Sequence, residues 1–278
     1  MAANVRSYGR AILAVLGSAG GVHTAQAIGL GVLQGITEFL PVSSSGHLVL
    51  AEHVFGIARP GLSLEVGVHL GTLLAVAIRY RADLARVLRQ PQRGIERGLA
   101  LCVATLPAAA VGWAGGPAVE RLFGSLRAVA VAWCVGGLAL VAVARRPLGR
   151  RRLSGMRLRD ALWIGACQAL ALAPGISRSG ATLAAGLASG FEPEQAVRFA
   201  FLLSVPAVAG AALLELPSLA ALPPMSLAFL GLAAAVAAVT GLWAIRACEG
   251  RVRTGGLAGF GYYCIGLGLL CLGWWWLR

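Results

Sequence analysis

Charged residues are scarce in this chain of 278 residues. They make up 13% of the sequence, against 58% for hydrophobic residues, and the mean hydropathy is +0.78. A soluble domain carries roughly 25% charged residues, so one water-soluble core could not bury this much apolar surface. Strict alternation, the mark of a membrane β-barrel, is also missing, and the apolar blocks are about 20 residues long, as bilayer-spanning helices require. The sequence therefore predicts an all-α integral membrane protein.

Lysine is absent, so all 24 basic residues are arginines, and the 11 acidic residues leave a formal charge of +13. Such a charge is compatible with nucleic-acid binding. Most of the arginines, however, lie in short loops between apolar blocks, where they set the orientation of membrane helices. We therefore expect the membrane, and no nucleic acid, as the partner of these arginines.

Patterns for zinc sites and disulfide frameworks are also lacking. The six cysteines form no C-x-x-C pair, and the four histidines do not cluster. Neither kind of site is therefore supported. The cysteines lie within apolar blocks, which predicts that they are small packing residues.

Six apolar blocks are long enough to span a bilayer. Two further segments, 26–57 and 160–190, each read as two short helical runs separated by a break rich in proline, serine and glycine. Broken backbone at membrane depth is tolerated only where it is buried in protein or lines a wet cavity. We therefore predict two re-entrant helical hairpins in addition to six spans, at residues 63–80, 98–115, 126–144, 195–215, 226–246 and 257–277.

The order of one hairpin and three spans occurs twice, in residues 26–144 and again in 160–278, with a basic linker at 145–159. Because three is an odd number, the second copy must be inverted, and arginine-rich loops alternate with arginine-poor loops as that requires. Inverted repeats usually place a site near the midplane, where the broken segments meet. Residues 1–25 are an N-terminal extension, either a weak signal peptide or a short segment at the membrane interface.

The first broken segment carries polar residues suited to an anion. Gln34 and Glu38 are four residues apart and share one helical face before Pro41 ends the helix. A serine-rich turn that opens the next helix offers backbone N–H groups and a positive dipole end to a phosphate. The turn and the start of that helix contain Ser43, Ser44, Ser45 and His47.

The second broken segment carries Arg178 in its break. An arginine at membrane depth implies an anionic partner, and its planar fork suits phosphate oxygens. Together the two segments supply groups for phosphoryl transfer: Glu38 to hold a divalent cation, Arg178 to stabilise the transferring group, and His47 to activate a nearby serine. The alternative is that Glu38 and Arg178 only pair to lock the hairpins together.

A second acidic and histidine pair occurs near the start of the first predicted span. Glu65 and His69 share a helical face there. This pair could extend the metal site, and it could equally face the interior of the helix bundle.

The motifs QGITEFLPVSSSGH (34–47) and PGISRSGAT (174–182) are long and specific. At these residues the chain resembles the undecaprenyl-pyrophosphate phosphatase family of bacterial membranes, the type linked to bacitracin resistance, over nearly all of its length after residue 25. The resemblance implies a hydrolase of the plasma (inner) membrane that removes the terminal phosphate of a long-chain prenyl pyrophosphate and so recycles the lipid carrier of cell-wall synthesis. It also implies a requirement for Mg²⁺ or Ca²⁺, and a homodimer is considered as the assembly.

The resemblance assigns roles residue by residue. The metal-binding pair of the family falls on Gln34 and Glu38, the essential histidine on His47, and the phosphate-binding arginine on Arg178. Substrate contacts are expected from Ser43, Ser45, Ser177, Ser179 and Thr182.

Two questions stay open at this level. Many relatives have glutamate where this chain has Gln34, whose amide oxygen can ligate a hard cation without contributing charge. The nucleophile is Ser44 or His47, and we favour Ser44 with His47 as the acid/base.

The alternative function is an inverted-repeat transporter or flippase of a phosphorylated lipid carrier, which would not need the serines and the histidine together.

Overall fold

The computed structural model describes residues 20–55, 62–89, 91–220 and 224–277. Within these ranges every element is helical, apart from an isolated bridge between Arg151 and Phe191. The prediction of an all-α protein is therefore confirmed. Most of the predicted N-terminal extension lies outside the described residues.

The first half of the chain forms a helical pair followed by four helices. These are α2 (Gly20–Phe39), α3 (Ser44–Phe55), α4 (Leu62–Arg79), α5 (Arg81–Arg89), α6 (Pro91–Phe123) and α7 (Leu126–Ala144). The second half begins with a short 3-10 turn, η1 (Leu153–Gly155). It continues with α8 (Leu158–Leu170), α9 (Arg178–Ala188), α10 (Pro193–Leu202), α11 (Ser204–Ala220), α12 (Pro224–Arg253) and α13 (Leu257–Trp276).

Five helical segments of the described chain are long and apolar enough to cross a membrane: Gly98–Phe123, Leu126–Ala144, Pro193–Leu213, Leu227–Arg253 and Leu257–Trp276. Large apolar side chains such as Leu106, Leu138 and Leu269 are exposed on them. Exposed apolar surface of this extent is stable in lipid and unfavourable in water. The chain is therefore a multi-pass membrane protein.

Several predicted boundaries differ in the structure. Helix α2 begins at Gly20, so the expected boundary at residue 26 lies inside a helix. The block 195–215 is interrupted at Leu203, between α10 and α11. Six spans are not confirmed. Helix α4 coincides closely with the predicted block 63–80 and, among the described residues, carries the shorter apolar stretch Val66–Arg79.

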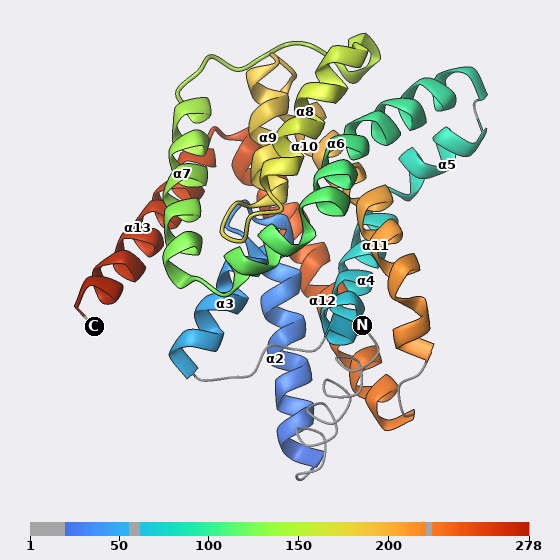
Figure 1. The fold of residues 1–278 in the computed structure, drawn as a ribbon. Coiled ribbons are helices and arrows are strands. Elements are labelled where there is room, and N and C mark those ends of the chain that lie inside the picture. Colours follow the sequence, from blue (N-terminus) through green and yellow to red (C-terminus); the bar gives the residue numbers. More distant parts are fainter. Residues whose placement is uncertain (1–19, 56–61, 90, 221–223, 278) are drawn as a thin grey trace.

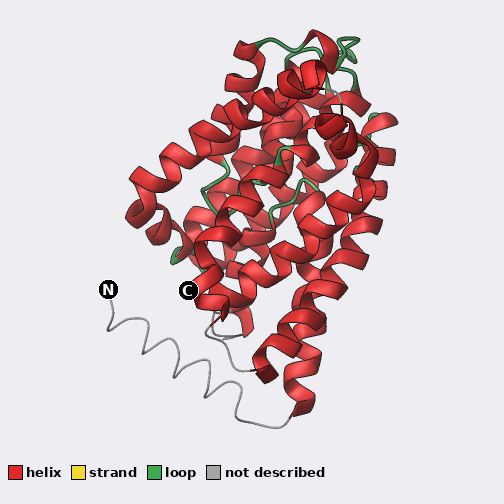
Figure 2. Ribbon diagram, turned by 90° about the vertical axis from the view of Figure 1, so that its right-hand side faces the viewer, coloured by secondary structure: helices red, strands yellow, loops and turns green. Residues whose placement is uncertain are grey.

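The two broken segments form helical pairs (hairpins), α2 with α3 and α8 with α9, and the loops of the two pairs meet in the interior. In Figure 1, α2 and α3 approach the centre of the molecule from below, and α8 and α9 approach it from above. Figure 2 shows loops crossing the middle of the helix bundle as well as its ends. Helix α2 packs along α12 and α8 packs along α6, so each hairpin is held by a helix from the other half of the chain.

Glycines allow these helices to pack closely. A Cβ atom added at Gly31 of α2 would lie 2.6 Å from the Ala233 carbonyl oxygen of α12. A Cβ atom at Gly165 of α8 would lie 2.5 Å from the Ala104 carbonyl oxygen of α6. Small residues at such crossings bring backbones together, which is how membrane helices gain packing energy.

We predict that Gly31→Ala destabilises the protein by about 1–3 kcal/mol, because the new methyl group overpacks the crossing of α2 and α12. Gly29→Ala is the matched control, since nothing lies within 4 Å of its added Cβ, and alanine favours a helix more than glycine does. The measurement is the thermal unfolding midpoint in detergent, followed by circular dichroism. Equal midpoints for the two variants would contradict the role given to Gly31.

Candidate active site

A cavity of about 290 Å³ lies where the two hairpin loops meet. Its polar lining comes from both loops and includes Gln34, Glu38, Ser43, Ser44, Ser45, Ser177 and Arg178. Its apolar lining includes Leu48, Val49, Val119, Phe123, Leu172 and Ile176. The cavity therefore offers a polar end and an apolar wall, as a lipid with a charged headgroup requires.

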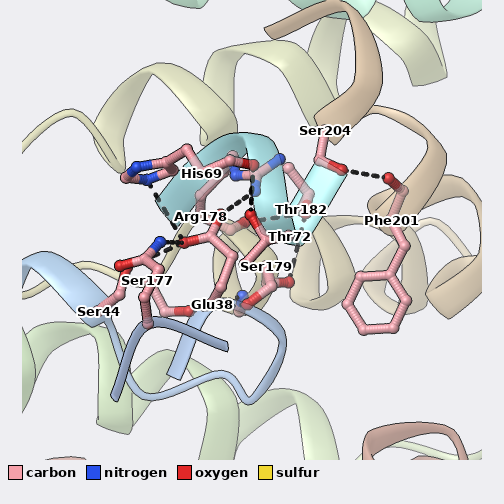
Figure 3. Close-up of polar contacts among 12 residues, drawn as sticks. Glu38, Ser44, His69, Thr72, Ser177, Arg178, Ser179, Thr182, Phe201 and Ser204 are labelled. Atoms are coloured by element: carbon pink, nitrogen blue, oxygen red, sulfur yellow. Dashed lines mark hydrogen bonds and ion pairs between the residues drawn. The ribbon is translucent and has the colours of Figure 1, made fainter. Parts of the chain in front are cut away.

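Glu38 is the point on which the polar side chains converge (Figure 3). Its Oε1 accepts a hydrogen bond from Arg178, which also makes the ion pair between the two hairpins. Its Oε2 accepts from Gln34 Nε2 and from Ser44 Oγ, both at 2.9 Å. The His69 Nε2 atom lies 3.7 Å from the same oxygen. Glu38 is buried, so its charge depends on these partners rather than on water.

Local geometry explains how Arg178 reaches Glu38. Arg178 is the first residue of α9, and the preceding Ser177 caps the helix by accepting the Gly180 N–H at 3.1 Å. A positive side chain at a helix N-terminus opposes the helix dipole. The Glu38 carboxylate offsets this, and so would a phosphate group placed between the two residues.

Ser43 joins the two loops. Its backbone has φ of 70°, the left-handed region that is uncommon for a residue with a side chain. Its Oγ accepts the N–H of Gly46 at 3.3 Å and the N–H of Gly175 at 3.2 Å. Gly175 itself has φ of 101° and lies too close to Val129 for a side chain. Ser43 therefore satisfies backbone donors of both breaks at once.

His47 does not line the cavity, and the expected hydrogen bond between Ser44 and His47 is not made. His47 Nδ1 is 2.7 Å from the Ser43 carbonyl oxygen, and Nε2 is 2.8 Å from the Tyr263 hydroxyl of α13. Because a carbonyl can only accept, Nδ1 carries the proton and Nε2 accepts from Tyr263. The ring also stacks on Tyr263 and contacts Trp133 edge-on. In this arrangement His47 holds the Ser43 turn, and Ser44 donates to Glu38 instead.

Comparison with known proteins agrees with the motifs. Residues 27–270 match the family described as bacitracin resistance protein BacA. The chain belongs to this family. It is 42% identical to an undecaprenyl-diphosphatase of Moorella thermoacetica over 258 residues, which cover 91% of this chain and 98% of that protein. A protein of the same name from Korarchaeum cryptofilum is 40% identical over 268 residues, covering 90% of this chain and 99% of that protein.

Two of the expected substrate-binding residues of this BacA-family chain point into protein. The Ser179 hydroxyl is 3.0 Å from the Ser177 hydroxyl and 3.4 Å from the Leu40 carbonyl oxygen. The Thr182 hydroxyl donates to the Arg178 carbonyl at 2.9 Å, within its own helix. Neither residue lines the cavity. Both support the loop that presents Arg178, whereas Ser43, Ser45 and Ser177 line the cavity, and their contact with substrate stays a prediction.

The structure adds lining residues from helices outside the hairpins. His69 of α4, and Val119 and Phe123 near the end of α6, all line the cavity. The sequence carried a signal for His69, its spacing from Glu65, and that signal pointed equally to the bundle interior. No sequence signal pointed to Val119 and Phe123, because apolar residues in an apolar helix look alike until the packing is known. The side chain of Glu65 lies outside the described residues.

The donor atoms around Glu38 suit a hard cation. Gln34 Oε1 is buried without a hydrogen-bond partner, so an acceptor stands free beside the carboxylate. In the part of the chain that the structure describes, no three side chains of histidine, cysteine, aspartate or glutamate group together. Mg²⁺ is commonly held by one or two carboxylates together with water and phosphate oxygens, and Ca²⁺ also takes side-chain amide oxygens. The residues therefore fit a cation held jointly with a phosphorylated ligand.

We predict that Ser43→Ala lowers the free energy of unfolding by about 1–3 kcal/mol, because it leaves a buried N–H on each loop without its acceptor. Ser45→Ala is the control, since the Ser45 hydroxyl contacts only the Ser43 hydroxyl among the hydrogen bonds of the two loops. The thermal unfolding midpoint of each purified variant is the measurement. A drop in Ser45→Ala as large as that in Ser43→Ala would show that Ser43 does not join the loops.

Proposed function

We propose that this protein removes the terminal phosphate of undecaprenyl diphosphate, releasing inorganic phosphate and undecaprenyl phosphate. The relatives at about 40% identity over most of the chain are named undecaprenyl-diphosphatase. The observation that carries the proposal is the convergence of the Ser44 hydroxyl and Arg178 on Glu38 inside the cavity. In the plasma (inner) membrane this reaction regenerates the lipid carrier of cell-wall synthesis.

Ser44 is the nucleophile in this proposal, and Glu38 takes the proton role expected of His47. The Ser44 hydroxyl already donates to Glu38 Oε2 at 2.9 Å, so the carboxylate can accept its proton as Oγ attacks the terminal phosphorus. The bridging P–O bond breaks, and the prenyl phosphate leaves. Water then cleaves the phosphoserine ester, Ser44 regains a proton, and phosphate departs.

Arg178 stabilises the charge on the transferring group. Its guanidinium reaches Glu38 from the opposite loop, so a phosphate entering between them exchanges one anionic partner of Arg178 for another. The planar fork binds two phosphate oxygens, and the cavity walls limit water, which strengthens the attraction. The apolar residues Val119, Phe123 and Leu172 also line the cavity and suit contact with the prenyl chain.

A divalent cation belongs to the same proposal. Glu38 and Gln34 would hold Mg²⁺ or Ca²⁺, which when bound neutralises diphosphate charge. With Gln34 in place of a second carboxylate, this pair brings one negative charge to the cation instead of two.

The proposed architecture is an inverted repeat of residues 26–144 and 160–278, each with one re-entrant hairpin and three spans. Two features support it. The hairpins approach the centre from opposite ends of the molecule (Figure 1). The packing of α2 on α12 is matched by that of α8 on α6, each with a glycine against a carbonyl oxygen. A homodimer stays a prediction.

Two alternatives to the hydrolase give no role to Ser44. A pair that merely locks the hairpins needs Glu38 and Arg178, which do pair, but it gives no role to a serine that donates into the cavity. A transporter or flippase likewise needs no nucleophile beside a carboxylate. The Ser44 to Glu38 hydrogen bond therefore favours the hydrolase.

We expect purified protein in detergent to release phosphate from undecaprenyl diphosphate, and Ser44→Ala, Glu38→Ala and Arg178→Ala each to lose at least about 100-fold in kcat/KM. Losses of 10² or more are typical when a nucleophile or a charge-stabilising group is removed. The control is the double variant Glu38→Arg with Arg178→Glu, which keeps a pair of opposite charges. A folded double variant with wild-type activity would show that the pair serves only to lock the hairpins.

Metal removal gives a separate prediction. Chelation by EDTA should abolish phosphate release, and titration with Mg²⁺ should restore it, because the cation offsets diphosphate charge that Arg178 alone cannot. Gln34→Glu should lower the Mg²⁺ concentration for half-maximal activity, since it adds a second carboxylate. Undiminished activity in EDTA would exclude the cation from the reaction.

A further inference from the structure

His69 reaches the active cavity from α4, a helix that belongs to neither hairpin (Figure 3). Its Nε2 atom faces Glu38 Oε2 at 3.7 Å. The Gln34 amide contacts the same carboxylate oxygen through its Nε2 at 2.9 Å, and its Oε1 is buried without a hydrogen-bond partner. An imidazole nitrogen, a carboxylate oxygen and an amide oxygen thus lie around one corner of the cavity.

The distance between His69 and Glu38 is informative. At 3.7 Å it is too long for a good hydrogen bond, which needs about 2.7–3.2 Å. Two atoms that each bind one cation at about 2.0–2.2 Å, however, can lie up to roughly 4 Å apart. The spacing therefore suits two ligands of one ion better than it suits a direct pair.

The carboxylate divides its two oxygens between different partners. Arg178 occupies Oε1, so its guanidinium does not block the side that His69 faces. Gln34 Nε2 and Ser44 Oγ both donate to Oε2, and a half-turn of the Gln34 amide would present its Oε1 to an ion at that oxygen. Such a turn would also give Oε1 a partner, and a buried acceptor without one costs about 1–3 kcal/mol.

We propose that His69 is a third protein ligand of the divalent cation, together with Glu38 and Gln34. The proposal rests on the cation of the proposed function, and it ties α4 to the hairpins through the metal. Histidine compensates for the missing second carboxylate by supplying a strong neutral donor where Gln34 supplies a weak one.

The test uses Mn²⁺, which takes the oxygen ligands that Mg²⁺ takes and is paramagnetic. Pulsed electron paramagnetic resonance of the full chain in detergent detects a ¹⁴N hyperfine coupling when an imidazole nitrogen binds Mn²⁺. We expect the coupling in the wild type, its change to a ¹⁵N coupling after labelling of histidine with ¹⁵N, and its loss in His69→Gln. The Kd for Mn²⁺ should rise at least about tenfold in that variant.

His53→Gln is the matched control, because His53 does not line the cavity. His53 is exposed on α3 and bonds the Val49 carbonyl of its own helix. This control should keep the ¹⁴N coupling. Each variant is first checked for a thermal unfolding midpoint close to that of the wild type, and the labelled wild type gives an answer that depends on no variant.

Three results would overturn the ligand role: no Mn²⁺ binding by the wild type, bound Mn²⁺ without a histidine coupling, or a coupling that persists in His69→Gln. Phosphate release is measured on the same wild-type preparation with Mn²⁺. Release without the coupling removes His69 from the metal and leaves the phosphatase function intact. A coupling without release supports the ligand and rejects the function.

Discussion

The ion pair of Glu38 with Arg178 is the interaction on which the rest of the structure depends. Both groups lie deep in a membrane protein, where an unpaired charge is too costly to keep. Glu38 lies at the end of α2 and Arg178 begins α9, and the ion pair between them joins the two hairpins. The two hairpins therefore position each other, and the cavity exists only because their loops meet at this pair.

Backbone hydrogen bonding imposes a second constraint. In a lipid environment each broken helix leaves N–H and C=O groups that water cannot reach. Ser43 satisfies two of these groups by accepting an N–H from each loop. Trp133 satisfies a third by donating to the Val42 carbonyl. The left-handed backbone at Ser43 is maintained because these bonds, and the one from His47, surround it. The same hydrogen bonds therefore stabilise the two loops and hold the reactive groups in place.

The chemistry follows from where the surrounding helices place their side chains. Tyr263 of α13 binds His47 and turns it toward the Ser43 turn, which leaves Glu38 as the only carboxylate or imidazole that Ser44 contacts among the hydrogen bonds described. Helix α4 brings His69 to the same carboxylate. Both helices lie outside the two motifs, so the motifs alone could not show that His47 faces the Ser43 turn while His69 faces the Glu38 carboxylate.

The sequence by itself determined the class of protein, the two broken segments and the polar residues in their breaks. Apolar blocks, helix-breaking prolines and the spacing of Gln34 from Glu38 are local properties, and local properties are readable along a chain. Only the tertiary structure decided which side chains face the cavity: it placed His69 inside and directed His47, Ser179 and Thr182 into protein. It also interrupted the block 195–215 at Leu203. These outcomes depend on contacts between helices far apart in sequence, and a hydrophobic pattern specifies that a face is buried without specifying what it is buried against.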